Sequence, residues 1–135
     1  MKPVILFTFF AFLLLYGTPN ISACLCPSLS AKKRVKIIKK ESDVIFTGTV
    51  KTVSKESGTT YKIILTVQQS WKAKGIKEYI IYTSGGCSVW FEEGKTYLVY
   101  AKINENNQLI TEMCWGTGII EYSRKDIKIL GKPIL

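Results

Sequence analysis

Residues 43–67 read DVIFTGTVKTVSKESGTTYKIILTV, and this stretch decides the fold. Apolar side chains alternate with polar ones on both sides of a short polar centre. The first run places Val44 and Phe46 on one face, and the second does the same with Ile63 and Leu65. Alternation of this kind is typical of strands that bury one face, and the Ser-Gly pair between the runs is a turn signal. The stretch therefore predicts a long β-hairpin.

The rest of the chain predicts further strands and a basic helix. The strands are expected at residues 78–83, 96–102 and 108–111. Residues 28–42 predict an amphipathic helix with a serine cap, and residues 123–130 a short terminal helix. Within the first strand, Gly48 predicts a bend or a close approach of another segment. Five β segments with no convincing helix between them predict an all-β domain, a small closed or nearly closed barrel.

The first 23 residues have the order of a secretory signal peptide. Met1 and Lys2 give a positive start, residues 4–16 form an apolar run with a single threonine, and small residues precede Cys24. A membrane-spanning helix needs about 18 to 20 apolar residues, which disfavours an uncleaved anchor. We therefore expect residues 1–23 to be removed and residues 24–135 to form the exported domain, extracellular or in the cell envelope.

Cys24 also ends a stretch that fits a bacterial lipobox, ISAC at residues 21–24. In a lipoprotein, the sulfur of this cysteine carries diacylglycerol and its amine is acylated. Signal-peptide cleavage would instead leave a free amine and a thiol on the same residue. Membrane anchoring through Cys24 is therefore an alternative to free secretion.

Four cysteines lie in the predicted exported part: Cys24, Cys26, Cys87 and Cys114. An even number in an oxidising compartment predicts two disulfides. A bond between Cys24 and Cys26 would close a very tight ring, so two connectivities remain, each joining the CxC pair to Cys87 and Cys114. A zinc site made of all four is disfavoured because the pair spacing is unusual and the chain has no histidine.

The chain is strongly basic, with a formal net charge of +9. Such a charge attracts polyanions without a dedicated site. Six of the nine residues at 32–40 are basic, and they are the candidate polyanion contacts: Lys32, Lys33, Arg34, Lys36, Lys39 and Lys40. A solvated helix face is the commoner explanation, because Val35, Ile37 and Ile38 interrupt the run and can dock on a core.

The absence of histidine excludes Ser-His-Asp and Cys-His catalysis. Phosphate-binding glycine loops and nucleophile-elbow motifs are also missing from the sequence. The carboxylates are scattered, and we expect them to be exposed, solubilising charges; they include Asp43, Glu78, Glu92, Glu93, Glu105, Glu112, Glu121 and Asp126. We therefore expect a protein that is not an enzyme and needs no cofactor.

Six aromatic residues stand in or beside apolar runs. Exposed rings on a five-stranded barrel can bind single strands or sugars, but these positions favour packing in the core and at the barrel ends. The six are Tyr61, Trp71, Tyr79, Trp90, Tyr97 and Trp115.

Four pieces of sequence occur together: CLC at residues 24–26, DVIFTGTV at 43–50, SGGCSVWFEEGKTYLVYA at 84–101 and TEMCWGTG at 111–118. In this order and spacing they resemble the netrin-like module of the tissue inhibitors of metalloproteinases and their bacterial relatives, over nearly the whole mature chain. The resemblance implies an OB-like five-stranded β-barrel with flanking helices. It also implies one of the two connectivities, Cys24 with Cys87 and Cys26 with Cys114.

In those inhibitors the mature N-terminal cysteine carries the function, and Cys24 matches it. The resemblance implies that the α-amine and carbonyl oxygen of Cys24 chelate the catalytic zinc of a target protease. An α-amine has a pKa of about 7.7 to 8.0, so it can lose its proton and bind a metal. The other residues of this protease-binding edge would be Leu25, Cys26, Pro27, Gly85 and Gly86. By itself, the glycine pair predicts only a turn.

Two functional hypotheses follow. The first is a secreted, monomeric, inhibitor-like protein that engages a zinc protease through Cys24. The second is a cell-envelope lipoprotein, a non-catalytic OB-fold binding module anchored through the same residue. The chain lacks the third disulfide and the C-terminal domain of the animal inhibitors, and its loops are short, which reduces the contact area for a protease. Lipidation would leave Cys87 without a partner, which favours the first hypothesis, whereas the lipobox match at residues 21–24 favours the second.

Overall fold

The computed structural model describes residues 24–134, so the predicted signal peptide lies outside the described residues. The strands are β1 (Val44–Ser57), β2 (Thr60–Lys72), β3 (Glu78–Thr83), β4 (Thr96–Ile103), β5 (Leu109–Ile110) and β6 (Gly118–Ile119). The helices are α2 (Ala31–Glu41) and α3 (Arg124–Leu130), with 3-10 turns at Met113–Trp115 and Ile120–Tyr122. The predicted mostly β architecture with two helices is confirmed; β6 was not predicted.

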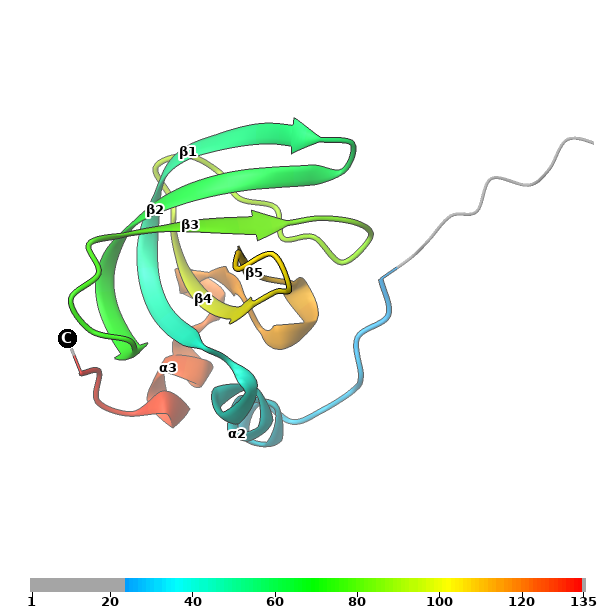
Figure 1. Cartoon of the computed structure of the whole chain (residues 1–135). Helices are drawn as coiled ribbons and strands as arrows, with labels where there is room; N and C mark the ends of the chain where they lie inside the picture. The colour runs from blue at the N-terminus through cyan, green and yellow to red at the C-terminus, as the bar shows by residue number, and fades with distance from the viewer. Residues whose placement is uncertain (1–23, 135) are drawn as a thin grey trace, which may run out of the picture.

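Five strands form a ring (Figure 1). They follow one another in the order β1, β2, β3, β5 and β4, and β4 pairs back onto β1. The β3–β5 pairing is parallel, and the other pairings are antiparallel. Strand β6 adds to β4 through Tyr97 and Leu98. Every long strand therefore has a hydrogen-bonded neighbour on both sides over part of its length.

Strand β1 closes the ring because it has two partners at once. It pairs with β2 from Ile45 to Ser57 and with β4 from Val44 to Thr49. Its register with β2 shifts between Thr47 and Gly48. A side chain at Gly48 would bring a Cβ to 2.9 Å from the Phe46 ring and 3.2 Å from Leu65 Cβ. The predicted close approach at Gly48 is confirmed, and it lets the strand curve tightly over its own core.

One apolar core fills the ring. It consists of inward-facing side chains of β1 to β4 and of the β3–β4 loop: Val44, Phe46, Val50, Ile63, Leu65, Tyr79, Ile81, Val89, Phe91, Tyr97, Val99 and Ala101. The rings of Phe46 and Tyr79 pack with centroids 4.6 Å apart. The alternation seen in residues 43–67 therefore identified the buried face correctly.

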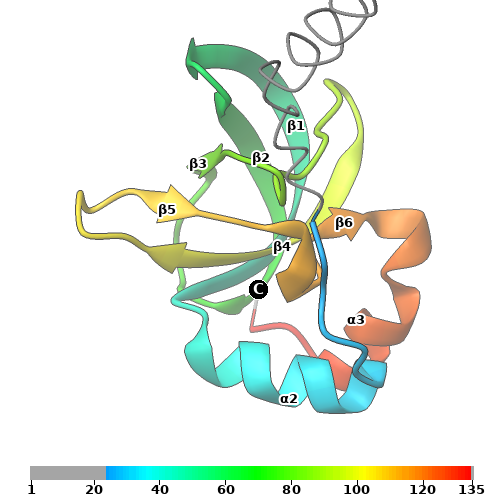
Figure 2. The same cartoon turned by 90° about the vertical axis from the view of Figure 1, so that its right-hand side faces the viewer.

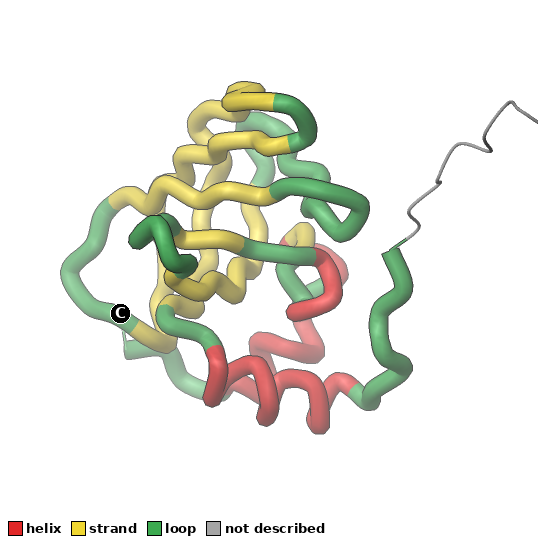
Figure 3. Tube along the Cα trace, turned by 45° about the vertical axis from the view of Figure 1, so that its right-hand side comes forward, coloured by secondary structure: helices red, strands yellow, loops and turns green. Residues whose placement is uncertain are grey.

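A second core lies between the ring and the helices, which both cover the same side of the sheet (Figures 2 and 3). It contains Val35, Ile38, Ile45, Trp71, Leu98, Tyr100 and Leu130. Ser30 caps α2, because its Oγ accepts from the Lys33 amide at 3.3 Å. Docking through Val35 and Ile38 is confirmed. Docking of Ile37 was wrong: its side chain is 42% exposed, because one step along a helix turns it by about 100°.

A partly buried ion pair joins the two helices. The guanidinium of Arg34 donates two hydrogen bonds of 2.8 Å to Asp126, and the phenol of Tyr100 donates to the same carboxylate at 3.0 Å. The prediction of an exposed, solubilising Asp126 was therefore wrong, because this residue is only 5% exposed. Desolvation raises the pKa of Tyr100, so the phenol stays protonated and can donate.

We predict that Asp126→Asn lowers the free energy of unfolding by about 3 kcal/mol, because it leaves the Arg34 guanidinium without a counter-charge in a partly buried site. The matched control is Glu78→Gln, which breaks the exposed pair with Lys51 (2.9 Å) and should cost less than about 1 kcal/mol. Urea denaturation under non-reducing conditions measures both. Equal losses in the two variants would contradict the role given to Asp126.

Candidate functional site

Two disulfides attach the N-terminal segment to the ring. They join Cys24 to Cys87 and Cys26 to Cys114, the connectivity that the resemblance implied, with Cα–Cα distances of 4.9 and 5.1 Å. Disulfides are typical of oxidising compartments outside the cytosol. Among the described residues, no helix has the length and apolar character to cross a membrane.

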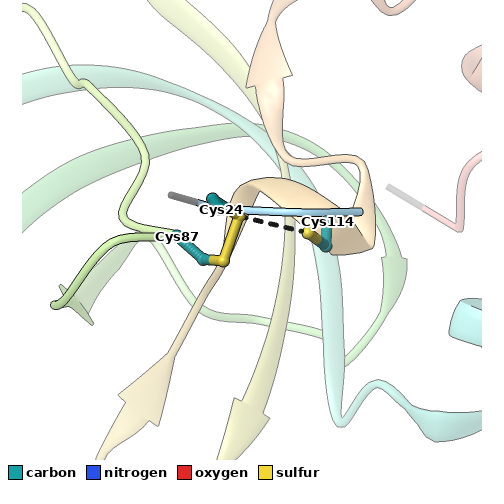
Figure 4. Close-up of side chains that lie close together, drawn as sticks. All are labelled: Cys24, Cys87 and Cys114. Carbon is teal, nitrogen blue, oxygen red and sulfur yellow. Dashed lines mark hydrogen bonds between the residues drawn. A yellow bond between two sulfur atoms is a disulfide. The ribbon is translucent and has the colours of Figure 1, made fainter. Parts of the chain in front are cut away.

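The two disulfides lie against each other; Figure 4 shows the Cys24–Cys87 bond beside the sulfur of Cys114, the partner of Cys26. The Sγ atoms of Cys24 and Cys114 are 3.4 Å apart, and those of Cys24, Cys87 and Cys114 all lie within 4.8 Å of one another. All of these sulfurs are oxidised, so the short distances are packing contacts between atoms that carry no thiol proton. Metal binding requires thiolates, and the cluster in its disulfide form supplies none.

The two cysteines that receive the N-terminal segment are themselves joined. Cys87 lies in the β3–β4 loop and Cys114 in the 3-10 turn Met113–Trp115, and the Met113 amide donates to the Cys87 carbonyl at 3.0 Å. Both disulfides therefore rest on one connected base.

Buried hydroxyls fix that base to β4. Thr111 Oγ1 donates to the Tyr100 carbonyl at 2.8 Å, and Thr117 Oγ1 accepts from the Tyr100 amide at 2.9 Å. Gly116, next to them, has a φ of 100°, and a side chain there would collide with the Arg34 guanidinium. The TEMCWGTG segment thus holds Cys114 in place through contacts on both sides.

The segment from Cys24 to Ser30 is coil that runs back from α2 along the side of the ring (Figures 1 and 2). Within the described part of the chain, residues 24–29 make no backbone–backbone hydrogen bond, so the disulfides supply their attachment. Leu25 is 89% exposed, and Cys26 and Pro27 are exposed as well.

The Cys24–Cys87 bond brings the first predicted site residue next to Gly85 and Gly86, which precede Cys87 and are exposed. The structure thus gathers the predicted residues on one surface, the N-terminal edge: Cys24, Leu25, Cys26, Pro27, Gly85 and Gly86. Gly85 has a φ of 76° and its carbonyl accepts from the Ser88 amide at 3.3 Å, so the glycine pair does form the predicted turn.

The basic helix presents a face of lysines. At about 100° per residue, Lys32, Lys33, Lys36, Lys39 and Lys40 fall within an arc of about 120°, and the buried Val35 and Ile38 lie outside this arc. All five are exposed, and none takes part in an ion pair among residues 24–134. Arg34 was predicted with them, but it differs from the five lysines because its guanidinium forms an ion pair with Asp126; polyanion binding by any of the six stays a prediction.

The expected packing of the aromatic residues is confirmed for Trp71, Tyr79 and Tyr97, which are buried. Trp115 packs against the second core, between the ring and the helices. The expectation is wrong for Trp90, which is 81% exposed, and Tyr61 is 37% exposed. Trp90 stands in the loop between the Cys87 disulfide and β4. Its position between a cysteine and the Glu-Glu-Gly turn signal was the available sign of a loop residue.

No protein-family model matches the chain, and no curated protein matches it. The likeness to the metalloproteinase inhibitors therefore rests on the sequence motifs alone and stays a prediction. The predictions of a non-enzymatic, monomeric protein stay predictions.

We predict that Cys26→Ser combined with Cys114→Ser lowers the free energy of unfolding by about 3 to 4 kcal/mol. The Cys24–Cys87 bond remains, so the unfolded chain regains only the freedom of the shorter loop that runs from Cys26 through this bond to Cys114. Guanidinium denaturation under non-reducing conditions measures the loss. Ser54→Ala, on the exposed end of β1, is a control that leaves both disulfides intact. An unchanged midpoint in the double variant would show that this disulfide does not stabilise the fold.

Proposed function

We propose that this protein is a secreted inhibitor of zinc metalloproteinases that acts through the mature N-terminus at Cys24. The observation that carries the proposal is the Cys24–Cys87 disulfide, which fixes Cys24 beside the Gly85–Gly86 turn while leaving Leu25 in solvent. An exposed chain end held rigidly in this way is suited to enter a narrow cleft.

The proposed mechanism uses two backbone atoms of Cys24. Cleavage after Ala23 creates a free α-amine, and this nitrogen and the Cys24 carbonyl oxygen would together chelate the zinc of the protease. They would displace the water that the metal activates for attack on a peptide bond. The amine must be deprotonated to bind, so inhibition should weaken as the pH falls below the amine pKa of about 7.7 to 8.0.

The disulfides support this mechanism by limiting the entropy lost on binding. A free chain end would have to be ordered when it entered the cleft, and each immobilised side chain or segment costs affinity. Cys24 and Cys26 are both tied to the ring, so the residue between them has little freedom left. Leu25 would fill an apolar pocket of the protease, and burial of a leucine side chain contributes about 1.5 to 3 kcal/mol.

We further propose that the ring is an OB-type barrel and that residues 24–135 form a netrin-like domain. The five-stranded ring, its order β1, β2, β3, β5, β4 and the return of β4 to β1 support the first assignment. The two observed disulfides support the second.

The alternative function, a lipoprotein anchored at Cys24, needs the Cys24 sulfur for a thioether. That atom is bonded to Cys87 here, and lipidation would free the Cys87 thiol in an oxidising compartment. We therefore favour secretion without an anchor.

We predict that one extra alanine before Cys24 lowers inhibition of a sensitive zinc metalloproteinase by more than about 100-fold, because the α-amine is then displaced from the metal. The protein is first checked by intact mass for a bare Cys24 and then assayed against a panel of secreted zinc endopeptidases.

Leu25→Gly is the companion variant. It keeps the amine and should weaken inhibition by only about 10- to 100-fold, the worth of one leucine side chain. Denaturation midpoints of both variants should match the parent protein, since Leu25 is exposed. Retained inhibition by the extended protein would rule out chelation by the amine.

The lysine face of α2 supports a second partner, a linear polyanion. Lys32 and Lys33 lie in the first turn, where the helix dipole favours acidic residues, so folding alone does not explain them. Five ammonium groups on one face, none of them ion-paired with a described residue, would follow the charges of an extended anionic chain.

We predict that Lys32, Lys36 and Lys39 changed together to Gln weaken binding of inorganic polyphosphate by about tenfold at low salt, because three cations are removed from one face. Lys55, Lys74 and Lys77 changed to Gln give a control of equal net charge. Titrations at two salt concentrations measure both. Equal weakening in the two variants would mean that only net charge matters.

A further inference from the structure

A hollow of about 410 Å³ opens between the β1–β2 hairpin and the part of the β3–β4 loop at residues 85–91. Buried Ile63, Val89 and Phe91 line its inner part. The more exposed side chains of Val53, Tyr61 and Trp90 line the rest. The hollow borders the N-terminal edge at Gly85, but its other lining residues belong to neither proposed binding surface.

The hollow exists because the hairpin is longer than the ring. Pairing between β1 and β4 ends at Thr49 and Thr96, whereas β1 continues to Ser57. Beyond that point the inner face of the hairpin has no strand opposite it, and the loop covers it instead. In Figure 1 the hairpin extends past the other strands above this loop.

Hydrogen bonds join the hairpin and the loop at both ends of the hollow. At one end the Gly85 amide donates to Thr59 Oγ1 at 3.3 Å. At the other end the Val53 amide donates to Glu93 Oε1 at 3.0 Å. These contacts keep the two walls at a set distance, so the hollow is preformed.

The loop that carries Trp90 is also fixed from below. Tyr97 Oη accepts from the Glu92 amide at 2.9 Å and donates to the Trp90 carbonyl at 3.2 Å. The Val89 amide donates to Thr83 Oγ1 at 3.0 Å. Trp90 is thus held in solvent by a well-bonded backbone on both sides. An exposed tryptophan beside an apolar cavity indicates a surface that is covered by a ligand.

The lining defines the chemistry of that ligand. The volume of the hollow falls in the range of small-molecule sites, and its walls are mainly aliphatic and aromatic. The one charged residue in the lining is Lys55, which forms no ion pair with another described residue. The nearby Glu93 carboxylate already accepts from the Val53 amide. Apolar walls with one free ammonium at an open rim suit a molecule that is apolar at one end and anionic at the other.

We propose that this hollow binds a small single-chain amphiphile with an anionic head group, such as a medium-chain carboxylate. Its chain lies between Trp90, Tyr61 and the buried Phe91, and its carboxylate pairs with Lys55. This site does not use the Cys24 amine, so the proposal of ligand binding is tested independently of the proposal of protease inhibition.

The test uses three probes that share a twelve-carbon chain: dodecanoate, dodecyltrimethylammonium and dodecyl maltoside, each below its micellar concentration. Isothermal titration calorimetry on the mature, disulfide-bonded protein should show one saturable site that prefers dodecanoate. Trp90→Ala should weaken dodecanoate binding by about tenfold through lost apolar contact. Lys55→Gln should weaken it by about threefold and remove the preference over the maltoside.

The controls are Tyr122→Ala, a change of an aromatic residue that is 90% exposed outside the hollow, and Lys62→Gln, which lies beside Tyr61 in sequence but on the other face of β2. Both should bind dodecanoate as the parent protein does, as should the protein with an extra alanine before Cys24. The proposal is overturned if dodecanoate shows no saturable binding, if the ammonium probe binds as tightly, or if Trp90→Ala has no effect. Unchanged melting curves show that each variant is folded.

Discussion

The structure depends on a single strand with two partners. Because β1 pairs with β2 along its length and with β4 along its first half, one curved strand closes the ring and also carries a hairpin beyond it. Curvature at this point requires a residue without a side chain, and Gly48 meets that need. The overhanging hairpin must then be covered from within by the β3–β4 loop. That loop carries Cys87 and Trp90, so the proposed protease-binding edge and the proposed ligand site both follow from the geometry of β1.

The N-terminal coil needs another means of attachment, because residues 24–29 form no backbone–backbone hydrogen bond within the described part of the chain. Two adjacent disulfides attach it to two segments of the ring. The segment with Cys114 is fixed to β4 by buried threonines, and the loop with Cys87 is joined to that segment by a backbone hydrogen bond. Asp126 completes the arrangement, because it binds Arg34 of α2 and Tyr100 of β4 with the same carboxylate. The N-terminal edge is thus held by two disulfides, and helix α2, which follows it in the chain, is held by the ion pair with Asp126.

The features that depend on local periodicity could be predicted from the sequence. The features that depend on contacts between distant residues could not. Alternation in β1 and β2 predicted the core that fills the ring, and the Ser30 cap with Val35 and Ile38 predicted α2. The residues alone left two disulfide schemes open, and only the family resemblance chose between them. Burial of Asp126 could not be foreseen, since its partner Arg34 lies 92 residues away. Strand β6 has two residues, too few for any period.

The distance along the chain between Arg34 and Asp126 also bears on when this protein can fold. Its second core, its two disulfides and its ring closure each join segments that are tens of residues apart, and the ion pair joins residues 92 positions apart. Contacts of long sequence separation form late and slowly. Docking of α2 through its ion pair therefore waits for the segment that carries Asp126, and a fragment that ends before this residue would leave the Arg34 guanidinium without its counter-charge.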